Sequence, residues 1–168
     1  GRSPISIIQQ VHEPRRSESQ ALPFRITNEI ENTDAANLYD LLVGSARRAL
    51  EDGDLTTAEG SARSLLVAIR GNVARGQSID AGWVSGAVDL VLDLSAASND
   101  PVWIERSLDL YTATKKPMDA ATATRVAELA LRVRPAKTSL DAYLVMARIL
   151  GDTASVAALS PVAAQLGG

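Results

Sequence analysis

The sequence lacks cysteine and contains one histidine, His12. Without cysteine there is no disulfide framework, no thiolate metal site and no thiol nucleophile. A single imidazole excludes a metal site built from several histidines. His12 also lies in a proline-containing segment rather than on a predicted helix, which disfavours a serine–histidine–aspartate centre. We therefore expect a protein that is not an enzyme, with no cofactor and no metal.

A strong charge of one sign and long apolar runs are missing as well. Lys and Arg number 17, Asp and Glu number 20, and the net charge is -3. The chain thus lacks the basic excess of a dedicated nucleic-acid binder. No apolar run reaches the roughly 18 residues of a membrane-spanning helix. We expect no nucleic-acid partner and no membrane insertion.

The chain ends and residue usage suggest a source. The sequence starts at Gly1 without an initiator Met or the apolar core of a signal peptide, so we interpret it as a fragment of a longer, cytoplasmic protein. Arginine is preferred over lysine and alanine is abundant, which favours a bacterium with a GC-rich genome.

Two regions differ in pattern. Residues 1–32 contain Pro4, Pro14 and Pro23 and have no sustained helical period. This composition predicts an extended linker or tail segment. Residues 33–168 have apolar residues at helical spacing, and we interpret them as one helical repeat domain.

The helical region divides into about seven helices, with starts near residues 34, 54, 79, 101, 118, 139 and 153. The first begins at Thr33 or Asp34, either of which is a good N-cap. Gly53 and Gly151 favour helix ends, since glycine adopts the left-handed conformation that follows many helices. The predicted apolar face of the first helix consists of Leu38, Leu41, Leu42, Ala46 and Ala49. Trp83 and Trp103 are predicted to be core residues.

One stretch resembles a known repeat. Leu42, Ala46, Ala49, Gly53-Asp54-Leu55 and Ala58 follow the order of a tetratricopeptide (TPR) repeat: a large residue, a small residue one turn later, a Gly-Asp turn, and a small residue in the second helix. The resemblance covers one unit, residues 38–66. It implies antiparallel helical hairpins stacked as a TPR-like solenoid, with a generic antiparallel bundle as the alternative.

A second, weaker copy of this turn occurs at Ala147 to Asp152, with Gly151-Asp152 at its end. The first unit makes the first helix the leading member of a pair. The second copy gives that place to the sixth helix, which strict alternation does not allow. We therefore expect a TPR-like repeat rather than regular TPRs.

The resemblance implies a protein–protein interaction module, a scaffold or adaptor that binds a partner peptide or domain in a helical groove. Carried over from the matched unit, the groove residues are Asp40, Val43, Arg47 and Glu51, which share one face of the first helix. Reversing the charge of Arg47 is then expected to weaken partner binding while leaving the melting curve intact.

Two alternatives remain. The domain can instead be a helical accessory or regulatory domain of a larger multidomain signalling protein or enzyme, with residues 1–32 as the connection.

Asp89 and Asp93 share a helix face and form the only carboxylate pair we weigh for acid–base chemistry, although a solvated or arginine-paired face explains them better.

A homodimer through a helical end face is also a hypothesis, based on an apolar set made of Val156, Leu159, Val162 and Leu166.

Overall fold

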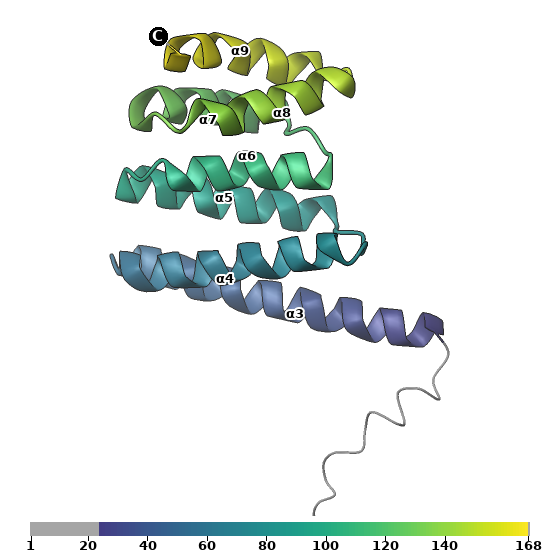
Figure 1. The fold of residues 1–168 in the computed structure, drawn as a ribbon. Helices are drawn as coiled ribbons and strands as arrows, with labels where there is room; N and C mark the ends of the chain where they lie inside the picture. The colour runs from purple at the N-terminus through teal and green to yellow at the C-terminus, as the bar shows by residue number, and fades with distance from the viewer. Residues whose placement is uncertain (1–23, 168) are drawn as a thin grey trace, which may run out of the picture. The chain divides into compact units, whose positions relative to one another are not determined.

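The computed structural model describes the backbone of residues 24–167 and the side chains of residues 35–167. The chain divides into two compact units, residues 1–38 and 39–168. Helices are the only regular secondary structure in the described part (Figure 1). Its helices are α3 (Phe24–Glu51), α4 (Leu55–Ala74), α5 (Ala81–Ser98), α6 (Val102–Thr114), α7 (Ala120–Val133), α8 (Lys137–Ile149) and α9 (Thr153–Gly167). The predicted all-α stack of about seven helices is confirmed for these residues.

The first helix starts earlier than the sequence pattern predicted. Helix α3 begins at Phe24, so the predicted start at Thr33 or Asp34 is wrong, and residues 24–32 are helical rather than extended. These residues contain neither proline nor glycine, so nothing stops a helix before the capping residues are reached. The rest of the predicted extended segment, residues 1–23, lies outside the described residues.

Two glycine turns confirm the helix ends that the sequence predicted. Gly53 and Gly151 have positive φ angles of 77° and 75°. After each glycine an aspartate amide donates to an alanine carbonyl five residues earlier, Asp54 to Ala49 at 2.8 Å and Asp152 to Ala147 at 2.9 Å. This bond, which spans six residues, is one of the two that close a Schellman turn. Gly76, with a φ angle of 79°, ends α4 in the same way through a bond from Gln77 to Asn72 at 3.0 Å, so turns with and without the Gly-Asp sequence share this geometry.

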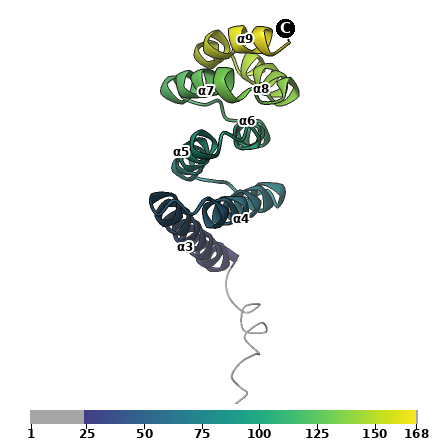
Figure 2. The same ribbon diagram turned by 90° about the vertical axis from the view of Figure 1, so that its left-hand side faces the viewer.

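Within residues 39–168 the helices form two rows, with α5 and α7 on one side and α4, α6 and α8 on the other (Figure 2). Helix α6 contacts both α4 and α8, and α9 packs against α7 and α8 at the C-terminal end. Helix α9 runs unbroken through Pro161. The largest fully buried side chains are Trp103, Tyr143, Leu65, Ile69, Leu90, Leu92, Leu94, Ile104, Leu108, Leu110, Leu140 and Leu159.

The apolar face of α3 is rotated from the predicted one. Tyr39 is buried at 3% exposure, whereas Leu38 and Leu41 are 44% and 64% exposed. Tyr39 shares a helix face with the buried Ala46, two turns later. Its ring packs edge-on against Trp83, with ring centroids 5.2 Å apart. The expectation that Leu38 and Leu41 face the core is therefore wrong, because the tyrosine fills that position.

Of the two tryptophans, Trp103 is a core residue and Trp83 is partly exposed. Among the helices that the structure describes, none combines the length and the apolar character required to cross a lipid bilayer.

Candidate functional site

The four residues predicted to line a groove lie along α3. Asp40 and Glu51 are exposed, and Val43 and Arg47 are half-buried. Arg47 is not available as a free contact, because its guanidinium forms an ion pair with Asp93 of α5. Asp93 also pairs with Arg125 of α7. A single carboxylate thus joins three helices.

The two ion pairs make Asp93 unsuited to acid–base chemistry. Partial burial on its own raises the pKa of Asp93, but the hydrogen bonds and positive charges of Arg47 and Arg125 outweigh it and hold the pKa below its ordinary value. A carboxylate that stays ionised between two guanidinium groups is a structural link and a poor proton donor. Asp89, its predicted companion one turn away, is exposed.

The ion pair also changes what a mutation of Arg47 is expected to do. A glutamate at position 47 would place a negative charge beside Asp93 and leave Arg125 as its sole partner. We therefore expect charge reversal to lower the melting temperature as well, contrary to the unchanged melting curve predicted from the sequence.

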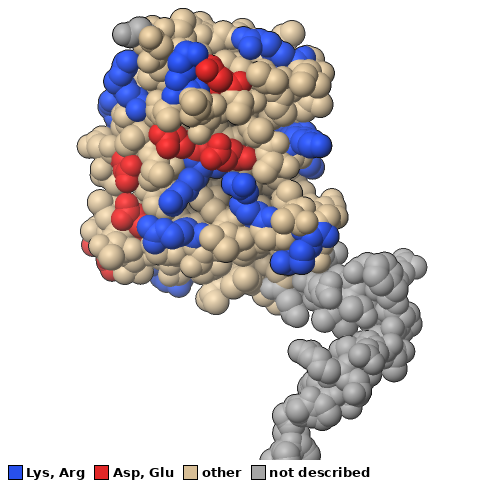
Figure 3. Space-filling view, in the orientation of Figure 1, with Lys and Arg blue, Asp and Glu red and all other residues tan. Residues whose placement is uncertain are grey.

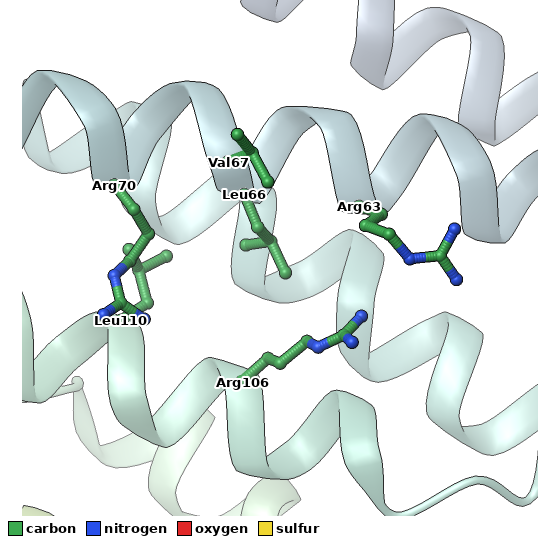
Figure 4. Close-up of a pocket in the computed structure, with 6 residues that line it drawn as sticks. All are labelled: Arg63, Leu66, Val67, Arg70, Arg106 and Leu110. Atoms are coloured by element: carbon green, nitrogen blue, oxygen red, sulfur yellow. The ribbon is translucent and has the colours of Figure 1, made fainter.

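A groove lies on the opposite row of helices, between α4 and α6. Its volume is about 480 Å³, within the range of ligand-binding clefts. Figure 4 shows the residues that line it. They are Arg63, Leu66, Val67 and Arg70 of α4 and Arg106 and Leu110 of α6.

The groove combines an apolar floor with a basic rim. Leu66 and Leu110 are buried and form the floor, and Val67 is 67% exposed beside them. Figure 4 shows Arg63 and Arg106 extending from facing helices toward one end, and Arg70 extending alongside Leu110. Basic side chains gather over α4 and where it meets α6 on this face of the molecule, and acidic side chains lie directly beside them (Figure 3). None of the lining residues is acidic.

Arg106 is the least solvated of the three arginines. Its guanidinium stacks on Trp103, with Cζ 4.8 Å from the ring centroid. Its Nη1 atom is buried and has no hydrogen-bond partner among the described residues. The cation–π contact offsets part of the lost hydration of the charge, but an aromatic face does not replace a hydrogen-bond acceptor. The arginine therefore keeps a positive charge beside the groove, while its buried Nη1 atom stays without a partner among the described residues.

Helix periodicity explains how the sequence builds this groove. Arg63, Val67 and Arg70 are spaced three and four residues apart and so share one face of α4. Arg106 and Leu110 are one turn apart on α6. Sequence reasoning missed the groove because helix periodicity alone does not show that α4 packs beside α6.

A buried polar cluster elsewhere has a structural role. The Tyr143 hydroxyl lies 2.9 Å from both the amide of Met118 and the hydroxyl of Ser155, and Ser155 in turn bonds Asp152. Burial raises the pKa of Tyr143, although its hydrogen bonds act in the opposite direction. The tyrosine is therefore neutral at physiological pH, and it ties the segment before α7 to α8 and α9.

Within the described residues no group of three or more His, Asp and Glu side chains is placed to hold a metal ion; His12 lies outside them. In the expected apolar end face, Leu159 and Val162 are buried in the domain, and Val156 and Leu166 are half-buried. Leu159 and Val162 therefore cannot contribute to a dimer surface without rearrangement of α9, because they pack inside the domain.

No protein-family model, no curated protein and no solved structure matches the chain.

Proposed function

We propose that the helical domain is a non-catalytic interaction module that binds a segment of a partner protein in the α4–α6 groove. The observation that carries the proposal is the groove itself, which joins an apolar floor to three arginines without a facing acid. Protein interfaces place apolar anchors in such pockets and use surrounding charges for orientation. Arginine is among the residues most often found at binding hot spots.

The proposal includes a divergent TPR-like repeat as the scaffold. Its support is the Gly53 turn, where the residues of the resemblance adopt the expected geometry, and the matching turn at Gly151. The Gly53 turn leads into α4, whereas the Gly151 turn follows α8, and α4 and α8 lie in the same row of helices (Figure 2). The two turns therefore occupy different places in the alternation of helices. The binding surface proposed here accordingly differs from the α3 face that the family resemblance implies.

Selection of a random peptide library on the immobilised full chain tests this function. A counter-selection uses Val67→Tyr, which fills the groove from an exposed position, and the control is Val145→Tyr at another exposed valine, 55% exposed on α8. We expect enriched peptides that bind the wild type and V145Y but not V67Y. Peptides that bind all three proteins equally would show that this groove is not the binding site. Failure to enrich any peptide would instead favour the accessory-domain alternative.

A further inference from the structure

The proposed binding function leaves the chemistry of the partner open, and the groove itself restricts it. Resting on that function, we propose that the α4–α6 groove takes an acidic, partly apolar peptide segment, in which carboxylates flank one large apolar side chain.

The local charge supports an acidic ligand. Arg63, Arg70 and Arg106 line the groove, and no acidic residue lines it with them. Among the described residues no carboxylate forms an ion pair with any of these three. The whole chain nevertheless has a net charge of -3. The three arginines therefore form a local positive patch on a chain without an overall basic excess, which favours recognition of a matching acidic segment over general attraction of polyanions.

The positions of the arginines define a spacing for the ligand carboxylates. Arg63 and Arg70 are separated by two helical turns, or roughly 10 Å along α4. Figure 4 shows Arg106 reaching toward the Arg63 end. One carboxylate fits between Arg63 and Arg106, and a second fits beside Arg70. Figure 4 shows the Arg63 side chain extending away from Arg70, so the two carboxylates lie at least this far apart, or at least about three residues of an extended peptide.

The floor defines what lies between the two carboxylates. Val67, which is 67% exposed, offers an accessible apolar surface to a leucine-sized or phenylalanine-sized side chain beside the buried Leu66 and Leu110. No aromatic residue lines the groove to stack with a base, and base stacking is the usual way in which single-stranded nucleic acid covers apolar surface. The combination therefore favours a peptide over an oligonucleotide.

Arg106 supplies the strongest discrimination against neutral ligands. Its buried Nη1 has no acceptor among the described residues. A carboxylate in the groove would be attracted by the charge of this guanidinium, whereas a neutral amide would gain less and an ammonium group would be repelled. We expect the affinity order acidic, neutral, basic for peptides that share the same apolar residue.

Fluorescence anisotropy with the full chain tests this order. The probes are three short labelled peptides with one leucine pattern, flanked by Glu and Asp, by Gln and Asn, or by Lys, together with an oligothymidylate of similar length. We expect the acidic peptide to bind roughly tenfold tighter than the neutral one. Its affinity should fall as salt is raised, and the oligonucleotide should compete poorly.

Matched variants assign the effect to the groove. Arg106→Gln should weaken binding of the acidic peptide by roughly tenfold. Arg63→Gln, at an exposed position, should weaken it by a smaller factor. The control, Arg132→Gln, removes an exposed arginine from α7, outside the groove. Val67→Glu adds a carboxylate within one turn of both Arg63 and Arg70, and it should compete with the peptide. Arg63 and Val67 are exposed, so these two variants test the inference even if Arg106→Gln unfolds the protein.

The outcomes separate the partner chemistry from the binding function. Groove-dependent binding of neutral or basic peptides, equal to that of the acidic one, would overturn the acidic-partner inference and leave the proposed function standing. Tight binding of the oligonucleotide that depends on the same arginines would identify a polyanion surface and also overturn it. Absence of binding by every peptide, in this assay and in the library selection, would overturn both proposals.

Discussion

The guanidinium of Arg106 lies over the ring of Trp103, with its Cζ atom 4.8 Å from the ring centroid. This contact holds a positive charge at the edge of the α4–α6 groove, and the Nη1 atom of the same guanidinium is buried. The charge is held by an aromatic surface and not by a carboxylate among the described residues, so it remains able to pair with an incoming acid.

Replacing Arg106 should affect binding and stability in opposite directions. Arg106→Met keeps an apolar stem over Trp103 and removes the buried donor that lacks a partner. We expect the free energy of unfolding to rise by about 1 kcal/mol, since an unsatisfied buried donor costs more than the cation–π contact contributes. Urea denaturation measures the change, with Arg63→Met as the exposed control. A loss of more than about 1 kcal/mol would show that the cation–π contact is the larger effect.

Neutralising Asp93 should loosen the contact between α3, α5 and α7. Asp93→Asn leaves Arg47 and Arg125 facing each other without the carboxylate between them. All three side chains are more than a third exposed, so we expect a loss of only about 0.5–1 kcal/mol in the free energy of unfolding. Asp89→Asn on the same helix is the control. Equal stability of the two variants would contradict a structural role for Asp93.

The same carboxylate predicts a dependence of stability on pH. The pKa of folded Asp93 lies below its ordinary value of 3.8, so the folded state binds the proton less readily than the unfolded state. Its contribution is therefore fully present above about pH 5 and is lost as the pH falls through the folded pKa. Urea denaturation at pH 7 and near pH 3 measures how much the free energy of unfolding falls on acidification. This fall should be smaller for Asp93→Asn than for the wild type. Identical losses in the two proteins would rule out this linkage.

Two glycine substitutions should change the stability of the protein in opposite directions. Gly53→Ala places a side chain at a φ angle of 77° and should destabilise the protein by about 1–2 kcal/mol. Gly86→Ala lies within α5, where an added Cβ meets no described atom within 4 Å, and it should stabilise by about 0.5–1 kcal/mol. Thermal unfolding of both variants provides the comparison. If Gly53→Ala melted at or above the wild-type temperature, the assigned turn would be wrong.

Removing the Tyr143 hydroxyl should be costly for a change of one atom. Tyr143→Phe leaves the buried amide of Met118 without its acceptor, and we expect a loss of about 1–3 kcal/mol. A double-mutant cycle with Ser155→Ala should give a non-zero coupling energy, because the two hydroxyls are 2.9 Å apart. Additive effects would show that the hydroxyls act independently.

The helices could be predicted from the sequence because their ends are encoded locally. Gly53 and Gly151 adopt the left-handed conformation for which glycine is preferred. The ends at Asn99, Lys115 and Arg134 use the same conformation without glycine, with φ angles of 56–57°. Asparagine is among the residues that tolerate this left-handed conformation, so Asn99 fits it. Lys115 and Arg134 adopt it only in the context of the folded turn.

Side-chain faces were harder to predict than helix ends. Leucine spacing on α3 indicated a face with Leu38 and Leu41, whereas packing against Trp83 selects the face with Tyr39. The groove was beyond sequence reasoning for a related reason. Arg63 and Arg70 have the pattern of a solvated helix face, and only the contact of α4 with α6 brings Arg106 opposite them.

Chemical-shift mapping of the isotope-labelled full chain with the acidic peptide tests the central claim most directly. The account predicts shifts at the backbone amides of Leu66, Val67 and Leu110 and at the side-chain Nε–H groups of Arg63, Arg70 and Arg106. Shifts confined to the predicted α3 surface of Asp40, Val43, Arg47 and Glu51, with none in the α4–α6 groove, would contradict it.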